Sequence, residues 1–200
     1  VQGCAARALV TDGDKVAGVE TDRGTIDTET VILAAGVWSV ELAASVGLRL
    51  PVTPVARHVW LTEPGDPLPH ELPLTIDFAT GFYFHREGDG LLFGGRESSL
   101  EDIATHAVHR LPLLEELGVK TGWWGYYEMS PDHNAIVGAT ESPTGLLYAT
   151  GFSGHGFQQA PVVGEHLADL ALGRAVRFDL SPFSVARFET AAEKPERYVI

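Results

Sequence analysis

Hydrophobic residues near the start of the chain fall into short runs separated by turn residues. The stretch KVAGVETDRGTIDTETVILAAG, residues 15–36, predicts a hairpin or meander that ends in the continuous apolar run TVILAA. Such a run is typical of a strand buried on both faces of a parallel sheet. Gly36 follows, and then a predicted helix with Ser39 as its N-cap and Gly47 as its C-cap. Strand, glycine and helix in this order indicate α/β structure.

The pattern changes between residue 51 and about residue 138. PVARHVWLT, LTIDFATGFYFHRE, LLFGGRES and WWGYYEM favour short strands, and FYFHREGDGLLFGG favours a hairpin around EGDG. SLEDIATHAVHRLPLLEELG predicts a helix with Ser98 or Ser99 as its cap and Gly118 as its stop. We therefore expect an antiparallel, strand-rich segment here.

The strand–glycine–helix pattern returns in LLYATGFSGHGFQQAPVVGEHLADLAL. Gly151, Gly154 and Gly156 lie between the predicted strand and the predicted helix, in which Pro161 requires either a place in the first turn or a kink. Glycines allow positive φ and close approach of a ligand, and the unpaired N–H groups at a helix start attract an anionic group. The alternative is a tight turn that only packs helix on strand.

These patterns divide the chain into four parts. Residues 1–49 are an α/β piece, 50–142 a strand-rich insert, 143–175 the return of the α/β piece, and 176–200 a C-terminal tail. Because an apolar strand needs neighbours on both edges, we expect 1–49 and 143–175 to pack together.

Composition and charge narrow the possible partners. The 200 residues are 44% hydrophobic and 20% charged, as in a globular protein, and the net charge is −13. This acidity argues against nucleic acid and anionic membranes as partners. The single cysteine, Cys4, excludes an internal disulfide and favours a reducing, cytoplasmic setting. No apolar run reaches the ~20 residues of a membrane span. The chain lacks an initiator Met, so we expect it to be part of a longer protein.

Hydrolase and metal chemistry have weak support. GFSGH places His155 where the nucleophile elbow around Ser153 needs glycine. His106 and His109 lie three positions apart on the predicted helix, but no carboxylate or cysteine pattern completes a metal site.

Four motifs in this order carry a family resemblance: VILAAGVWSVELAASVG, GFYFHREGDGLLFGG, GYYEMSPDHNAIVGAT and LLYATGFSGHGFQQAPVVGEHLADLAL. Together they resemble the FAD-dependent D-amino acid oxidase superfamily, and most of all its sarcosine oxidase, dimethylglycine dehydrogenase and glycine oxidase branch. The resemblance runs from about Lys15 to Leu172. It implies the C-terminal part of a Rossmann-like FAD-binding domain (α/β) plus an antiparallel-sheet substrate domain, that is, an α+β chain.

The resemblance also implies site residues. LAAGVW would place Ala35, Gly36 and Trp38 near FAD. GFSGHGFQ would place its backbone amides at the pyrimidine edge of the flavin, where a helix N-terminus stabilises the charge of the reduced ring. The residues of this second segment are Gly151, Ser153, Gly154, His155, Gly156, Phe157 and Gln158.

Some positions depart from the family pattern. The G-x-G-x-x-G motif for the FAD diphosphate is absent, which suggests the C-terminal half of a flavoprotein. By itself this half is expected to bind FAD weakly or not at all. Gln158 replaces the lysine that monomeric sarcosine oxidases use for oxygen activation, so we expect poor reaction with oxygen. Gly125 stands where some relatives attach flavin through cysteine, so FAD is expected to bind non-covalently.

The expected substrate residues lie in the insert and beside the SPD motif. Tyr127 occupies the position of the carboxylate-binding arginine of glycine oxidase-like members, which leaves Arg96 and Arg86 as candidate cations. Strand alternation places Tyr83 and His85 on one face, and Phe82, Phe84 and Arg86 on the other. Packing or surface roles stay open for all of these residues.

The resemblance thus implies oxidation of the C–N bond of a sarcosine- or glycine-like amine or amino acid by hydride transfer to flavin N5. One alternative is a flavin-fold binding or assembly module without turnover, and another is an inactive fragment. The expected partners are the small-molecule substrate and an oligomer or the missing N-terminal half.

Overall fold

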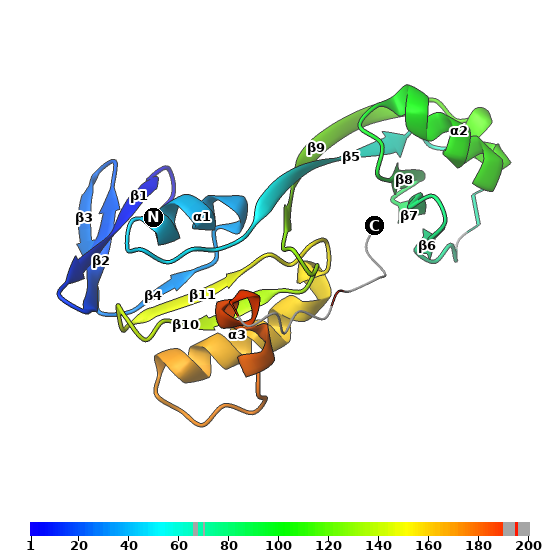
Figure 1. Cartoon of the computed structure of the whole chain (residues 1–200). Coiled ribbons are helices and arrows are strands. Elements are labelled where there is room, and N and C mark those ends of the chain that lie inside the picture. The colour runs from blue at the N-terminus through cyan, green and yellow to red at the C-terminus, as the bar shows by residue number, and fades with distance from the viewer. Residues whose placement is uncertain (66–67, 70, 190–194, 196–200) are drawn as a thin grey trace. The chain divides into compact units, whose positions relative to one another are not determined.

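The computed structural model describes residues 1–65, 68–69, 71–189 and 195 of the chain. These residues form two compact units (Figure 1). Among these residues, unit 1 combines Val1–Pro54 with those from Tyr127 to Glu189, and unit 2 lies between Val55 and Tyr126. The pattern had predicted divisions after residues 49 and 142. Of the predicted tail, residues 190–194 and 196–200 lie outside the described residues.

A three-stranded mixed sheet forms the centre of unit 1. Its order is β10 (Ile136–Ala139), β11 (Leu146–Thr150) and β4 (Val31–Leu33). The strand β11 is antiparallel to β10 and parallel to β4, with Leu147 opposite Ile32. This pairing confirms that the first and third predicted parts pack together. The strand β10, which the pattern had placed in the insert, pairs with β11 instead.

The two faces of this sheet are covered by different elements. One face packs against α1 (Ser39–Ala44) and the meander of β1 (Ala6–Asp12), β2 (Lys15–Thr21) and β3 (Gly24–Asp27). The other face packs against α3 (Gly156–Ala171), as Figure 1 shows. Every residue of β11 is buried, as its sequence predicts. The predicted burial of β4 on both faces is wrong at Ile32, which is 44% exposed. The apolar cluster under α3 includes residues of β10 and β11 but none of β4.

The last described segment closes unit 1 beside β10. It contains two short 3-10 helices, η3 (Ser181–Phe183) and η4 (Val185–Phe188), which both contact β10. Phe183 packs with the α3 cluster, whereas Val185 and Phe188 pack with the cluster on the opposite face. The segment therefore packs against both faces of the sheet.

The predicted start of α1 needs a correction. The chain coils already at η1 (Gly36–Trp38), where the Trp38 N–H donates to the Ala35 carbonyl at 3.2 Å and Gly36 adopts a positive φ of 57°. Ser39 is consequently inside the coil and does not cap it. Its Oγ accepts a hydrogen bond from the Ala35 N–H at 3.0 Å.

The described residues of unit 2 form a five-stranded sheet and one α-helix. The order of its strands is β6 (Thr75–Ile76), β7 (Tyr83–Glu87), β8 (Gly90–Gly94), β5 (Thr53–Thr62) and β9 (Val119–Met129). The strands β7 and β8 are antiparallel neighbours, which confirms the predicted hairpin. The ends of β5 and β9 belong to unit 1. One face of the sheet is apolar and packs on α2 (Leu100–Arg110).

The helix α2 is shorter than predicted. Its cap is Ser99, which is one of the two caps that the sequence predicted. The Ser99 Oγ accepts a hydrogen bond from the Asp102 N–H at 3.1 Å. The helix ends at Arg110, well before Gly118, because Pro112 cannot continue it and begins the 3-10 helix η2 (Pro112–Glu115).

Candidate functional site

Two glycine turns lie at the same edge of the unit 1 sheet. The parallel strands β4 and β11 lead into Gly36 and Gly151, which have φ of 57° and 68°, and each turn is followed by a helix. Gly154 also has a positive φ, 94°. The carboxyl ends of parallel strands form the usual ligand crevice of open α/β sheets. The residues predicted to bind the cofactor therefore gather at one edge.

The three glycines after β11 are closely packed, and Gly154 most tightly. A β-carbon at Gly154 would lie 2.7 Å from Cε2 of Tyr127, and one at Gly151 would lie 3.0 Å from Cγ1 of Ile136. At Gly156 it would lie 3.1 Å from Cβ of Phe152. The packing explanation thus accounts for the glycines, and it also fixes the path of the backbone whose amides a ligand would meet.

Glu128 and Thr150 join the two turns. The Thr150 hydroxyl lies 3.0 Å from the Gly36 carbonyl oxygen and 2.8 Å from Glu128 Oε2, and its single proton serves these two acceptors. Glu128 Oε1 accepts from the Phe152 N–H at 3.4 Å. The sequence analysis missed both residues, although Glu128 lies inside a quoted motif, because nothing local marks their role.

A cluster of buried polar side chains contacts the turn that follows β11. The Ser130 N–H donates to Ser153 Oγ at 3.1 Å, and Ser153 Oγ donates to the Gly151 carbonyl at 3.1 Å. Asp132 accepts two hydrogen bonds from Arg187, whose Nε lies 2.8 Å from Oδ2. Ser153 was a predicted site residue, and Arg187 and Asp132 were not.

The charge state of Asp132 follows from this pairing. Burial acts to raise the pKa of its carboxyl, but the Arg187 hydrogen bond, together with the Asn134 amide, the Arg187 charge and Ser130, holds the pKa below its ordinary value. Asp132 is therefore ionised at neutral pH.

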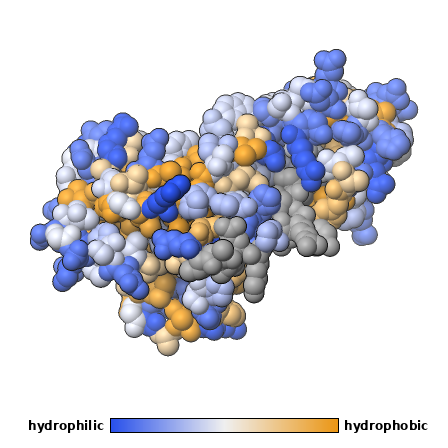
Figure 2. Space-filling view, viewed as in Figure 1, coloured by the Kyte–Doolittle hydropathy of each residue, from blue (hydrophilic) through white to orange (hydrophobic). Residues whose placement is uncertain are grey.

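The start of α3 presents polar groups and an exposed ring. His155 is its N-cap residue and makes no side-chain capping hydrogen bond. Phe157 is 95% exposed and Gln158 is exposed. Across the edge, Trp38 is 63% exposed. Apolar residues also reach the visible surface of unit 1 around α3 (Figure 2).

These features fit a flavin. Gly36, Gly151 and Gly154 hold backbone turns open at positive φ, and the uncapped α3 start leaves N–H donors for an acceptor edge. The exposed Trp38 and Phe157 offer apolar contact surface. Ala35 directly precedes the first turn, and His155 and Gly156 lie where α3 begins, so their roles at the flavin stay predictions.

Two of the predicted substrate residues of unit 2, Tyr83 and His85, share one face of its sheet. Tyr83 pairs with Gly94 across the hairpin, and the Arg96 side chain lies over Gly81, where a β-carbon would be 2.8 Å from Arg96 Nε. His85 is two residues from Tyr83 on the same strand. The opposite face carries Phe82 and Phe84, which are buried in the α2 core.

Arg86 is occupied by structural contacts. Its guanidinium donates to the carbonyls of Leu68 and Pro69 at 3.1 and 3.0 Å and to that of Gly88 at 3.0 Å. Of the two candidate cations, Arg86 therefore serves the fold. Tyr127 belongs to unit 1 and packs on Gly154.

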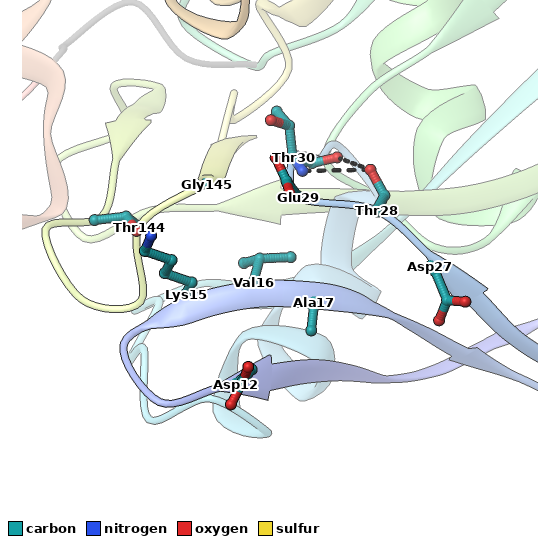
Figure 3. Close-up of a pocket in the computed structure, with 10 residues that line it drawn as sticks. All are labelled: Asp12, Lys15, Val16, Ala17, Asp27, Thr28, Glu29, Thr30, Thr144 and Gly145. Carbon is teal, nitrogen blue, oxygen red and sulfur yellow. Dashed lines mark hydrogen bonds between the residues drawn. The ribbon is translucent and has the colours of Figure 1, made fainter.

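A separate cavity of about 670 Å³ lies at the other end of the unit 1 strands (Figure 3). Thr30 and Gly145 on its wall directly precede β4 and β11, and Lys15, Asp12 and Asp27 come from the meander. It is thus distant along both strands from the glycine turns.

Two kinds of feature are absent from the part of the chain that the structure describes. No helix there is long and apolar enough to cross a membrane. No group of three or more His, Cys, Asp or Glu side chains in these residues could hold a metal ion.

Comparisons with known proteins agree with the geometry. Residues 1–170 match the family model described as DAO, FAD dependent oxidoreductase. The chain is 34% identical over 206 residues to FAD-dependent oxidoreductase domain-containing protein 1 of Xenopus laevis, covering 88% of this chain and 41% of that protein. It is 33% identical over 193 residues to glycine oxidase of Pseudomonas aeruginosa, covering 90% and 52%. It therefore spans about half the length of these curated relatives.

The fold has counterparts among solved structures. L-proline dehydrogenase from P. horikoshii superimposes with a TM-score of 0.82 at 26% identity, covering 94% of this chain and 54% of that chain. Glycine oxidase from Geobacillus kaustophilus does so with a TM-score of 0.81 at 26% identity, covering 92% and 52%. These matches confirm the predicted fold class and family resemblance.

Proposed function

Because the chain belongs to the DAO family of FAD-dependent oxidoreductases, we propose that the full-length protein oxidises the C–N bond of a small secondary amine or amino acid. FAD binds non-covalently at the sheet edge formed by Gly36 and Gly151–Phe157. The observation that carries the proposal is the pair of glycine turns at the carboxyl ends of two parallel strands, within the matched residues. The names of relatives such as glycine oxidase support the substrate class.

The chain's residues bind and orient in this proposal. The start of α3 supplies hydrogen-bond donors and partial positive charge to an electron-rich edge of the cofactor, because the N–H groups of Phe152, Ser153 and His155 are already bonded within the chain. Trp38 and Phe157 contribute apolar contact and exclude water. FAD, when bound, supplies the two-electron acceptor for the oxidation.

The substrate face is proposed to include Tyr83, His85 and Arg96. A guanidinium binds a carboxylate through two parallel hydrogen bonds, so Arg96 suits an amino acid substrate. Arg57 is a second candidate, because β5 pairs Val59 with Gly94 and so places Arg57, two residues earlier, on the same face. Tyr127 provides a ring beside Gly154 where glycine oxidase-like members have arginine.

The first experiment measures flavin binding and its reduction. Full-length protein is loaded with FAD and mixed anaerobically with N-methyl amino acids, amino acids and matched amines lacking the carboxylate. Loss of the flavin absorbance with one of the amino compounds supports the proposal. Stable FAD binding with no bleaching across the panel would favour the binding or assembly module, and no FAD binding would contradict the proposal.

The second experiment tests whether Arg96 binds the carboxylate of the substrate. Arg96→Met should raise KM for a carboxylate substrate by about 10- to 100-fold while changing that of the matched amine little. Arg110→Met is the control, because this exposed arginine on α2 lies 4.0 Å from Asp77. Equal loss for both substrate types would contradict carboxylate binding by Arg96.

Gln158 is proposed to limit reaction with oxygen. Reduction of O₂ creates negative charge, and a nearby cation in a dry site lowers that barrier by a few kcal/mol, or about 100-fold in rate. Gln158 offers an amide dipole only. Gln158→Lys should therefore speed reoxidation of the reduced flavoprotein in stopped-flow mixing with aerated buffer. Fast wild-type reoxidation without a gain in the variant would contradict this role.

A further inference from the structure

The ion pair of Arg187 and Asp132 is buried in unit 1. The two side chains are 6% and 2% exposed, and Nε and Nη2 of Arg187 lie 2.8 and 2.9 Å from the two carboxylate oxygens. A buried ion pair adds little net stability, because desolvation offsets much of the attraction. Its presence therefore raises the question of what arrangement it holds in place.

The guanidinium connects two segments that are distant in sequence. Its Nη1 donates to the carbonyls of Phe183 at 2.6 Å and Ser184 at 3.2 Å, in the segment of η3 and η4. Its Nη2 donates to the Asn134 carbonyl at 3.0 Å, in the turn between β9 and β10. Only the planar fork of arginine reaches these acceptors and both carboxylate oxygens at once.

The β9–β10 turn in turn contacts the glycine turn. Asp132 Oδ1 accepts from the Asn134 N–H at 3.2 Å and lies 3.3 Å from Ser130 Oγ. Ser130 has a single Oγ–H, which serves both this carboxylate oxygen and the Asn134 carbonyl, 2.7 Å away, so Asp132 and Asn134 together hold Ser130 in place. The Ser130 N–H then bonds Ser153 Oγ.

Ser153 is an unusual residue in this turn. It is fully buried and adopts a φ of 52°, which non-glycine residues seldom adopt. Its Oγ bonds the Gly151 carbonyl, and its N–H donates to the Glu128 carbonyl at 3.1 Å. Such a conformation persists only when surrounding contacts hold it, and Ser130 provides one of them.

We propose that Arg187 is a positioning residue for the flavin-binding turn, acting through Asp132, Ser130 and Ser153 on the peptide groups of residues 151–154. It lies beyond residue 170, where the family match ends. The inference rests on the proposed function, because it requires flavin at these peptide groups. Donors aimed in advance at developing charge stabilise it without reorganisation, so a loosened turn stabilises charge on the flavin less well.

The test measures sulfite binding to the FAD-loaded full-length protein. Sulfite donates its electron pair to flavin N5, and the resulting adduct carries negative charge on the ring edge that the turn would face. Its Kd follows from the loss of flavin absorbance and does not depend on substrate turnover. Arg187→Ala removes the fork, and Arg187→Lys keeps the charge without it. Arg177→Ala is the control, because this exposed arginine makes one ion pair, to Glu165 at 3.9 Å.

Both Arg187 variants should bind sulfite about tenfold more weakly, which is less than the 10²–10³ for outright loss of a donor. The control should stay within about twofold of wild type. Unchanged sulfite affinity in a folded Arg187 variant would overturn the inference, and so would failure of both variants to fold with FAD, because Arg187 would then be purely structural.

Gly154→Ala separates this inference from the proposed function. If Gly154→Ala weakens sulfite binding and the Arg187 variants do not, flavin lies at the turn and only the role of Arg187 fails. If neither position affects the flavin, the proposed site and the inference fail together.

Discussion

The two glycine turns of unit 1 share a plan but differ in how they are held. Both follow parallel strands, both begin with a glycine at positive φ, and both lead into a helix. The turn at Gly36 is mostly local, with Ser39 Oγ bonding the Ala35 N–H four residues away. The turn at Gly151 is held by distant segments, through Ser130, Asp132 and Arg187.

The difference follows from what comes after each glycine. The first turn continues as a 3-10 helix into α1, which has six residues. The second contains Ser153 in a left-handed conformation before α3, which has sixteen residues. Residues in such conformations need support from their surroundings. We infer that the second turn depends on the distant contacts, and the first turn much less so.

The largest expected effect is loss of the buried pair. Asp132→Ala leaves the Arg187 guanidinium buried without its carboxylate, so the free energy of unfolding should fall by about 3–5 kcal/mol. Asp89→Ala is the matched control, because Asp89 is 88% exposed and lies 3.9 Å from Arg86. This control should change stability by less than about 0.5 kcal/mol. Urea unfolding of the full-length protein measures both, and a similar loss in both variants would contradict a special role of the pair.

The second prediction compares the glycines themselves. Gly154→Ala combines a positive φ with overlap on the Tyr127 ring, so it should cost about 2–4 kcal/mol. Gly36→Ala should cost about 1–2 kcal/mol, because its β-carbon would lie 3.6 Å from Glu128 Oε2, an ordinary contact distance. In a Tyr127→Ala background the cost at Gly154 should fall to that at Gly36. An unchanged cost there would exclude ring overlap as its cause.

The local features of both turns can be predicted from the sequence, but the distant contacts that hold the second turn cannot. The glycines, β4, β11, the β7–β8 hairpin and the cap Ser99 all follow from local patterns, and the structure confirms them. The contacts of Asp132 with Arg187, 55 residues apart, follow from no local pattern. The predicted helix was too long because its stop was placed at Gly118, whereas α2 ends at Arg110, shortly before Pro112. Long-range polar pairing and helix breaking thus account for most of what was missed.

The third prediction concerns acid unfolding. The pKa of Asp132 is lowered in the folded protein, so the unfolded chain binds more protons at low pH. Its stabilisation is complete above the unfolded-state value, ordinarily 3.8, and is lost as the pH falls through the folded-state pKa. Between these values the residue contributes a slope of up to about 1.4 kcal/mol per pH unit. Asp132→Asn should remove that slope below pH 4 in urea titrations, and an unchanged slope would place the proton uptake on other carboxyls.

The smallest expected effect is at the contact between the two turns. Thr150→Val keeps the side-chain volume in the buried end of β11 but removes the hydroxyl that serves Gly36 and Glu128, so unfolding free energy should fall by about 1 kcal/mol. The control Thr144→Val should change it by less, because that exposed hydroxyl bonds the Asp14 carbonyl. Combined with Glu128→Gln, the cost of Thr150→Val should shrink if the two side chains act together. Fully additive costs would mean that the hydroxyl serves the Gly36 carbonyl instead, so that the first turn is held through β11 without Glu128.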